Sequence, residues 1–339
     1  MPRKKIILSF DYELFFGYKS GTVRKSLIEP TNLLLDGMDK YGLKGNFFVD
    51  WQMLKYLKLQ STQRTISDYN LIVSQLQDIV RRGHRIELHI HPHWVNAKYN
   101  NDGTWDFSDY SHYCLNSFSQ EEIMQMFVEG MDKLTEIARF VDPHYDICAF
   151  RAGGWAVQPF DKLKKAYQAV GLKIDSSVAY GAYYKSKSSF YDFRKEFLKE
   201  VDTYRFDDDV LISKENGEFL EVPISTYKRS LWLKVVDKTY RICTRKATPI
   251  TDGTHQRDDL PPMEKNPWSM VSMSRISPFT ALMSTILCGH KIITLIDHPK
   301  DYSPSVQQCF RLFSKLYTSL TYKAVSYTHL RAHETEADL

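Results

Sequence analysis

The chain has 339 residues, of which 43% are hydrophobic and 25% charged, and its formal net charge at pH 7 is +4. These values are typical of an ordinary globular protein. The net charge is too small for this length to indicate nucleic-acid binding, so we expect no nucleic-acid partner. Because α/β barrels of roughly 200–250 residues form single domains, the length does not require a division into two.

The five cysteines are scattered and contain no C-x-x-C pair: Cys114, Cys148, Cys243, Cys288 and Cys309. This pattern fits neither a disulfide framework nor a thiolate metal site, so we expect buried or incidental thiols in a reducing compartment. The basic start, Met1–Lys5, runs into an apolar stretch too short for a signal peptide. No later stretch is long and apolar enough to span a bilayer. We therefore predict a cytoplasmic location.

Short apolar runs alternate with longer segments of helical period, which indicates repeated β-α units around a parallel sheet. In chain order, we predict strands at 6–10, 46–49, 85–90, 147–150, 173–175, 219–222 and 292–296. We predict helices at 30–41, 68–82, 119–139, 159–170 and 303–317. The helix at 119–139 begins with a capping box, because Ser119 is followed three residues later by Glu122.

Two stretches interrupt this alternation. Residues 179–206 are crowded with Tyr and Phe, and residues 228–267 are basic and rich in turn formers. We interpret both as insertions over one mouth of the fold, where loops carry specificity. The aromatic run Tyr180–Phe193 could stack against sugars. The basic insertion could meet the phosphates of a nucleotide- or lipid-linked sugar, with a solvated loop as the alternative.

Three histidines follow the strand predicted at 85–90, in the run Glu87-Leu-His-Ile-His-Pro-His-Trp94. His89 and His93 are four residues apart, so on a turn they could face one cation together. His91 lies between them and, in an extended conformation, is expected to point away. Since α/β folds place their sites at the carboxyl ends of the strands, the pair predicts a divalent metal site. A histidine-rich surface turn is the alternative.

Two acidic residues end the first predicted strand, in Ser9-Phe-Asp-Tyr-Glu13. We expect two carboxylates two residues apart on an extended segment to face opposite ways, so that a local turn must bring both inward. One could then ligate the metal while the other takes a proton from the attacking water. The alternative is a helix cap or a solvated turn.

Two further strand ends deliver residues capable of chemistry. Arg151, in Phe150-Arg-Ala-Gly-Gly-Trp155, is placed to pair with a carboxylate, and its two glycines allow a ligand to approach closely. His298, in Leu295-Ile-Asp-His-Pro-Lys300, is placed to act as an acid or a base. An ordinary turn and a loop histidine are the alternatives. The hypothesis rests on four strand ends that converge on one rim.

The order of these motifs resembles that of the polysaccharide deacetylases, the NodB-homology enzymes of carbohydrate esterase family 4. Gly83–His93 resembles the zinc-histidine motif, and Ser9–Glu13 takes the place of a motif that usually carries adjacent aspartates. Phe150–Gly154 resembles the arginine motif, and Leu295–His298 the final histidine motif. Asp175 falls where a further motif acid is often found.

The resemblance spans roughly Lys5–Tyr317 and implies a distorted, seven-stranded (β/α) barrel that removes acyl groups from N-acylated sugars. It implies Asp11 as the general base, Arg151 as the group that keeps Asp11 anionic, and His298 as the acid that protonates the leaving amine. The implied ligands of a divalent metal, zinc in the first instance, are Glu13, His89 and His93. Because Asp11-Tyr-Glu13 replaces the paired aspartates, the division between base and ligand stays open.

Substrate contacts are expected from residues in or beside these motifs: Trp94, Gly153, Gly154, Trp155 and Asp175. Gly153 stands where the family commonly has a proline, which indicates a divergent branch. The expected substrate is an N-acetylated sugar or glycan precursor, for instance in envelope-sugar synthesis. A hydrolase of a non-sugar amide and a non-catalytic glycan-binding barrel are the alternatives. A pseudo-enzyme would be expected to lose Asp11 or His298, and the chain keeps both.

The catalytic domain is predicted to cover residues 1–324, with residues 325–339 as a non-native tail. In that tail, His329 and His333 repeat the four-residue spacing of a metal helix. The stretch Val325–Thr335 nevertheless looks like a translated transposase-type sequencing adapter, so we exclude it from the fold.

Overall fold

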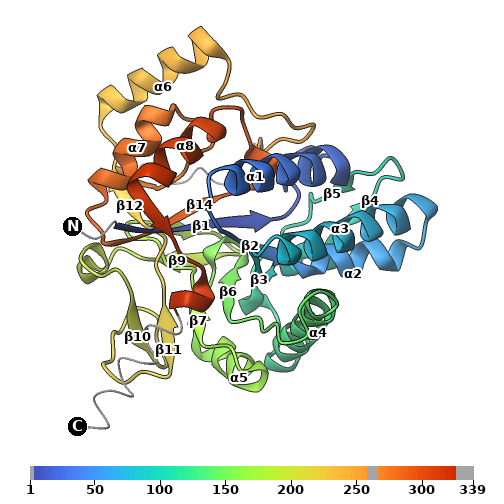
Figure 1. Cartoon of the computed structure of the whole chain (residues 1–339). Coiled ribbons are helices and arrows are strands. Elements are labelled where there is room, and N and C mark those ends of the chain that lie inside the picture. The colour runs from blue at the N-terminus through green and yellow to red at the C-terminus, as the bar shows by residue number, and fades with distance from the viewer. Residues whose placement is uncertain (1–3, 258–265, 326–339) are drawn as a thin grey trace.

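The computed structural model describes residues 4–257 and 266–325. Its centre is one curled sheet with strands in the order β10-β11-β7-β6-β3-β2-β1-β14, and β15 also pairs with β1 (Figure 1). Seven parallel strands make up the barrel wall: β1 (Lys4–Tyr12), β2 (Gly45–Asp50), β3 (Arg85–Ile90), β6 (Ala149–Ala152), β7 (Ile174–Asp175), β11 (Phe219–Glu221) and β14 (Ile292–Asp297). At the edge, β10 (Tyr204–Phe206) pairs antiparallel with β11, whereas β15 (Tyr317–Ser319) lies parallel to the start of β1.

Helices cover the outer face of the sheet (Figure 1). They are α1 (Glu29–Lys40), α2 (Trp51–Gln60), α3 (Gln63–Arg81), α4 (Gln120–Arg139), α5 (Asp161–Val170), α6 (Leu231–Thr244), α7 (Pro278–Leu287) and α8 (Val306–Leu316). Three short antiparallel pairs complete the fold: β4 (Lys98–Tyr99) with β5 (Trp105–Asp106), β8 (Tyr183–Lys185) with β9 (Phe190–Asp192), and β12 (Thr226–Lys228) with β13 (Trp268–Met270).

The chain that leaves β11 closes the curled sheet. The Ile224 N–H donates to the Val178 carbonyl oxygen at 2.8 Å, and the next N–H, of Ser225, donates to the Thr294 carbonyl oxygen at 2.9 Å. Two residues therefore bridge the β7 side of the sheet to β14. This is a distorted (β/α) barrel with seven parallel strands, which confirms the predicted fold class.

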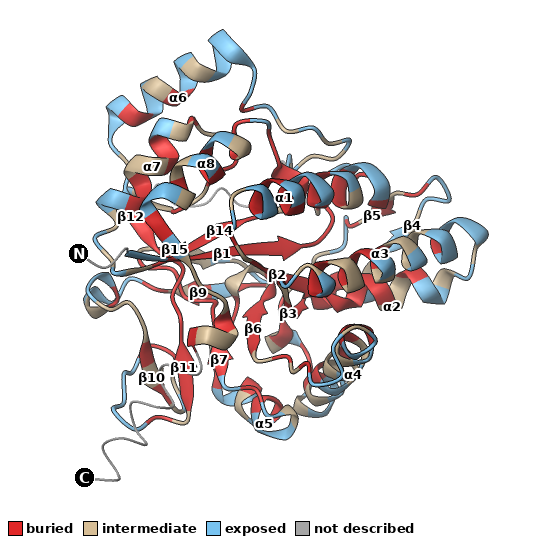
Figure 2. Ribbon diagram, in the orientation of Figure 1, coloured by how far each residue is buried: buried red, intermediate tan, exposed pale blue. Residues whose placement is uncertain are grey.

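Strand alternation divides the buried residues into two sets. On β1, Ile6, Leu8, Phe10 and Tyr12 belong to the large core between the sheet and its helices. Ile7 belongs to a second cluster inside the barrel, here called the barrel floor. In Figure 2 the central strands of the sheet are coloured as buried along most of their length. The floor consists of Ile7, Phe48, Ala149, Ile174, Leu220, Val222, Tyr322 and Val325.

Most predicted elements are observed within a few residues, and β3 is observed as predicted. The capping box of α4 is also confirmed, since the Ser119 hydroxyl accepts from the Glu122 N–H and the Glu122 carboxylate accepts from the Ser119 N–H. The turn-rich reading of 228–267 was wrong over Leu231–Thr244, which form α6. Sequence reasoning also missed α2 and α7, and the two histidines of the predicted tail lie outside the described residues.

Among the described residues, no helix combines the length and the apolar character that a membrane span requires. All five cysteines are free, and Cys114 and Cys309 are buried. Val325, at the predicted start of the tail, packs into the barrel floor with 1% of its surface exposed.

Candidate metal centre and active site

A cavity of about 500 Å³ opens at the carboxyl ends of the barrel strands. Its inner wall carries the predicted chemical residues Asp11, Glu13 and His298, together with His91 and Lys300. Its outer wall is mainly aromatic and hydroxylic, with Tyr110, Tyr113, Trp155, Tyr184, Tyr191, Ser186, Ser188 and Ser189. Side chains from several of the predicted strand ends therefore do meet in one cavity.

The sequence-based expectation about side-chain direction was wrong at two positions for one reason. Residues two apart on a strand share a face, because successive side chains alternate. β1 extends to Tyr12, so Asp11 and Glu13 both enter the barrel without a local turn. His91 continues the extended backbone of β3 (φ −106°, ψ 91°), so it points inward with His89 rather than away.

The Glu13 carboxylate meets two imidazoles. Its Oε2 lies 3.1 Å from His89 Nε2 and 2.8 Å from His91 Nε2. These three residues are buried and offer ligand atoms within 4.8 Å of one another. Burial alone would raise the Glu13 pKa, but Lys300, His91 and His89 outweigh it and hold the pKa well below its ordinary value. The group is therefore a carboxylate with two imidazoles, a donor set that suits zinc.

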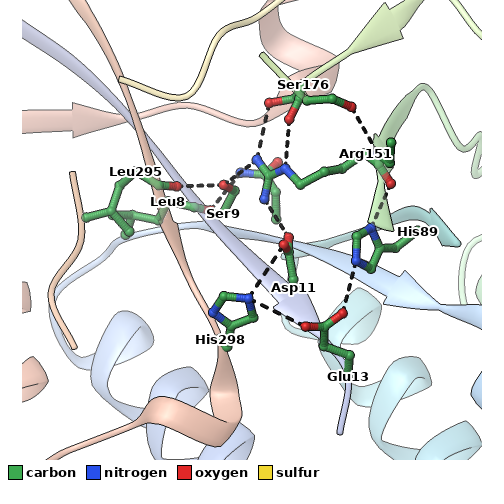
Figure 3. A network of polar contacts seen from close by, with 12 residues as sticks. Leu8, Ser9, Asp11, Glu13, His89, Arg151, Ser176, Leu295 and His298 are labelled. Carbon is green, nitrogen blue, oxygen red and sulfur yellow. Dashed lines mark hydrogen bonds and ion pairs between the residues drawn. The ribbon is translucent and has the colours of Figure 1, made fainter. Parts of the chain in front are cut away.

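The hydrogen bonding of His89 tests whether this group fits a cation. His89 Nδ1 lies 2.7 Å from the Arg151 carbonyl oxygen, and because that oxygen only accepts, Nδ1 carries the hydrogen. In the neutral ring, Nε2 then carries no hydrogen, and its lone pair faces the Glu13 oxygen (Figure 3). Two acceptors in contact require a proton or a cation between them. A backbone carbonyl that orients a histidine in this way is the usual outer partner of a metal ligand.

His93, the predicted second histidine ligand, does not belong to this group. The turn Pro92–Asn96 carries its fully buried ring among aromatic rings, with centroids 4.5 Å from Phe16 and 5.0 Å from Tyr113. Neither ring nitrogen has a hydrogen-bond partner within the described part of the chain. Burial and His91 lower the His93 pKa well below its ordinary value. The structure thus places His91 where the four-residue spacing had placed His93.

Asp11 is held by Arg151, as predicted. Arg151 Nη1 donates to Asp11 Oδ1 at 2.6 Å, and Nη2 donates to Ser9 Oγ at 2.9 Å (Figure 3). Its Nε donates to the Ser176 carbonyl oxygen at 2.8 Å, and its guanidinium carbon lies 4.2 Å from the centroid of the Phe48 ring. The guanidinium is fully buried, so it holds the Asp11 carboxylate from the barrel interior. The other carboxylate oxygen, Oδ2, is left facing the cavity.

His298 reaches both acids from β14. Its Nε2 lies 3.7 Å from Asp11 Oδ2 and 3.5 Å from Glu13 Oε1, and its Nδ1 lies 3.6 Å from Asp301 Oδ2. Burial and the Lys300 ammonium lower the His298 pKa to about 4, against the raising effect of the three carboxylates. The imidazole lines the cavity beside Asp11.

Sequence reasoning missed two residues that touch the site. Lys300 Nζ donates to Glu13 Oε1 at 2.7 Å and to the Leu14 carbonyl oxygen at 2.8 Å. Asp50, at the end of β2, accepts from the His91 N–H at 3.2 Å and so fixes the histidine loop. Both follow a predicted strand by the same rule that singled out Asp11 and His298, and this rule could have found them.

The five predicted substrate contacts divide into two groups. Gly154 and Trp155 line the cavity, where both adopt a left-handed backbone with φ 59°. Trp94 is buried in the core, where its Nε1 donates to Asp50 at 2.6 Å, and it does not line this cavity. Asp175 lies on the outer face of β7, where it accepts from the Tyr167 hydroxyl at 2.6 Å, and it does not line this cavity either.

Gly153 supports the site from behind instead of facing the cavity. A Cβ atom at this position would lie 2.5 Å from the Ile90 carbonyl oxygen and 2.8 Å from His91 Nδ1. A glycine is therefore needed for β6 to approach the His91 ring this closely. Its role is to make room for His91.

The two predicted insertions both reach the mouth. The hairpin of β8 and β9, within 179–206, supplies Tyr184, Ser186, Ser188, Ser189 and Tyr191 to the cavity wall. From 228–267, only His255 and Arg257 line the cavity among the described residues. The other described basic residues of that segment do not line the cavity. Three of them, Lys234, Lys238 and Arg241, lie on α6.

Comparison with known proteins supports the fold. No family model and no curated protein matches the sequence. A predicted polysaccharide deacetylase from Mycobacterium smegmatis superposes with a TM-score of 0.52 at 13% identity, covering 98% of this chain and 92% of that one. At this identity the similarity shows a common fold, so the chain has the barrel of a polysaccharide deacetylase.

Two further structures align less well. The catalytic domain of a peptidoglycan N-acetylglucosamine deacetylase from Eubacterium rectale gives a TM-score of 0.38 at 14% identity, covering 94% of this chain and 88% of that one. A Bacillus anthracis protein described as a pseudoenzyme of carbohydrate esterase family 4 gives 0.41 at 9% identity, covering 95% and 65%.

Proposed function

We propose that the protein is a metal-dependent hydrolase that removes N-acyl groups, acetyl in the first instance, from a sugar or glycan precursor. The observation that carries this proposal is that two groups of chemically active side chains meet at one cavity. One is the Glu13–His89–His91 group, and the other is the Asp11–Arg151 pair with His298 beside it. The deacetylase barrel agrees with this reading.

The metal ligands that we propose are Glu13, His89 and His91, with His91 in place of His93. A divalent ion, zinc in the first instance, would polarise the amide carbonyl and lower the pKa of the attacking water. Imidazole and carboxylate ligands suit several divalent ions, so metal content has to be measured. Lys300 occupies the other oxygen of Glu13 and so directs Oε2 toward the histidines.

The remaining residues move protons. Asp11 presents Oδ2 to the cavity while Arg151 holds Oδ1, which leaves one oxygen to take a proton from the attacking water. His298 stands 3.7 Å from that oxygen and is placed to pass a proton to the departing amine. The aromatic residues Trp155, Tyr184 and Tyr191 provide flat apolar surfaces on which a sugar ring can stack. The free cysteines fit the cytoplasmic location that we propose.

The test is the release of acetate from a panel of N-acetylated oligosaccharides, sugar nucleotides and lipid-linked sugars, before and after chelation and with zinc restored. We expect release that disappears on chelation. Asp11→Asn should lower the rate by about 10²- to 10⁴-fold while the metal stays bound. Asp109→Asn, an exposed acid outside the cavity lining, is the control and should leave the rate unchanged.

Each other outcome points elsewhere. Metal-dependent release from small amides alone would favour a non-sugar hydrolase. Calorimetric binding of the oligosaccharides without any release would favour a glycan-binding barrel, and it would contradict the enzymatic proposal.

A further inference from the structure

Helix α6 exposes a stripe of large apolar residues. Leu231, Val235 and Ile242 are 77%, 57% and 70% exposed, respectively. Their spacings of four and seven residues place them on one face of the helix. Trp232, 53% exposed, stands next to this stripe, with its ring centroid 5.4 Å from that of Phe279 on α7. Large apolar side chains exposed together on one helix face mark an interaction site more often than singly scattered ones do.

The opposite face of α6 is anchored to the protein. Leu233 is fully buried, and so is Asp237, whose carboxylate accepts from the Ser277 N–H at 2.8 Å and from the Arg229 guanidinium. The rotation of the helix is therefore fixed by a buried charge with its partners. The outward direction of the apolar stripe is a consequence of this anchoring.

A basic stripe runs beside the apolar one. The four exposed residues Lys234, Lys238, Arg241 and Arg245 follow one another at spacings of four and three, so they share the neighbouring face. Over 228–246 the chain has seven basic residues and a single acid, the buried Asp237. Among the described residues, no carboxylate pairs with any of the four. Figure 1 shows α6 as the outermost helix on its side, beyond α7 and α8.

We propose that α6 is a docking surface for an anionic lipid membrane, on which the helix lies in the plane of the interface. The apolar stripe would enter the boundary between headgroups and acyl chains, and the basic stripe would contact anionic headgroups. A second copy of this chain is a poorer occupant, because a two-fold contact would bring two basic stripes together. A nucleic-acid backbone would leave the apolar stripe without a partner.

Sedimentation of the whole protein with vesicles tests this inference. Vesicles of phosphatidylcholine with 30% phosphatidylserine should bind the protein, and pure phosphatidylcholine should bind it far less. Since each basic residue near an anionic surface contributes about fivefold in affinity, Lys234→Gln/Lys238→Gln/Arg241→Gln should weaken binding by about 100-fold. Leu231→Gln/Ile242→Gln should weaken it by at least tenfold at the same net charge.

Matched variants on other helices serve as controls. Lys40→Gln/Lys58→Gln/Lys315→Gln removes the same charge from α1, α2 and α8, and Leu59→Gln/Ile66→Gln removes two exposed apolar side chains. Both should bind close to the wild type, with unchanged far-UV circular dichroism. The proposal is overturned if the wild type does not sediment with anionic vesicles, or if the control variants lose binding as much as the α6 variants. It is also overturned if the apolar α6 variant turns a dimer into a monomer while vesicle binding stays constant.

Discussion

The two ends of the barrel interior are built from the same strands and differ in chemistry. At the floor, Ile7 and Phe48 pack with Tyr322 in an apolar cluster. At the mouth, Asp11 on β1 and His89 on β3 are equally buried, with 3% and 1% exposure, yet they are polar and connected to charged partners. Burial therefore does not distinguish the core from the site. The two regions differ in what stabilises a buried side chain, which is apolar packing at the floor and a charged partner at the mouth.

Arg151 joins the two ends. Its guanidinium lies over Phe48 of the floor and bonds Asp11 of the mouth. The comparison therefore predicts three kinds of variant. Changes at the floor should alter stability and spare zinc binding, changes at the mouth should alter zinc binding or activity and spare stability, and a change at Arg151 should alter both stability and activity.

Arg151→Met should have the largest effect. It leaves Asp11 as a buried carboxylate without its partner, which typically costs about 3–5 kcal/mol. Urea unfolding should show a loss of this size in the free energy of unfolding, and acetate release should fall with it. Arg151→Lys keeps the positive charge but loses the forked set of guanidinium N–H donors. Its free energy of unfolding should therefore lie between those of the wild type and Arg151→Met. A loss below about 1 kcal/mol for Arg151→Met would contradict the buried-pair account.

The sequence predicted the barrel because strands buried on both faces appear as apolar runs, separated by helices with clear amphipathic period. It also predicted Asp11, Glu13, Arg151 and His298, since each of these residues ends a strand. It could not predict α7 (Pro278–Leu287), because this helix buries hydroxyl residues such as Thr280 and Ser284 and exposes apolar ones such as Ile286, so its apolar residues do not mark the buried face. Helix α6 was missed because its exposed face mixes apolar and basic residues.

The choice between His91 and His93 needed the backbone. Spacing alone favours His93, because residues four apart lie on one side of a turn. The structure instead continues the strand through His91 and lets Pro92 turn the chain away afterwards. The lesson is that the register of alternation has to be followed past the end of the predicted strand.

A pH effect on stability should arise at His84, at the opposite end of β3 from the metal centre. His84 Nδ1 accepts from the Gly45 N–H at 3.0 Å, so protonation of this nitrogen would break the bond. Burial lowers the His84 pKa to about 4, against the opposing effect of Asp39. Because the unfolded chain then binds the proton first, stability is full above pH 6.5 and falls as the pH drops toward 4, by about 3 kcal/mol.

Urea unfolding at pH 7, 5.5 and 4.5 measures this loss. His84→Gln should flatten the dependence by close to one proton between pH 4 and 6.5. An unchanged slope in this variant would assign the loss to other groups.

Tyr322→Phe should have the smallest effect and act on stability alone. The Tyr322 hydroxyl lies 2.7 Å from Ser176 Oγ and accepts from Arg151 Nη2 at 3.3 Å, so its removal should cost about 1–2 kcal/mol. Thermal unfolding measures the loss, and zinc content should not change. Reduced zinc content in this variant would mean that the floor and the mouth are not separable.

Zinc affinity of His91→Gln and His93→Gln, measured by competition with a chelating dye, tests the assignment of the metal centre most directly. The changes are chemically identical and two residues apart, so each variant controls for the other. Loss of an outer partner of a metal site weakens binding by about 10- to 100-fold, so loss of a ligand should exceed 100-fold. We predict that His91→Gln loses more than 100-fold in zinc affinity. We predict that His93→Gln binds zinc within about threefold of the wild type, because the His93 ring lies among aromatic rings outside the ligand group. A wild-type affinity in His91→Gln together with lost binding in His93→Gln would contradict the assignment of Glu13, His89 and His91 as the metal centre.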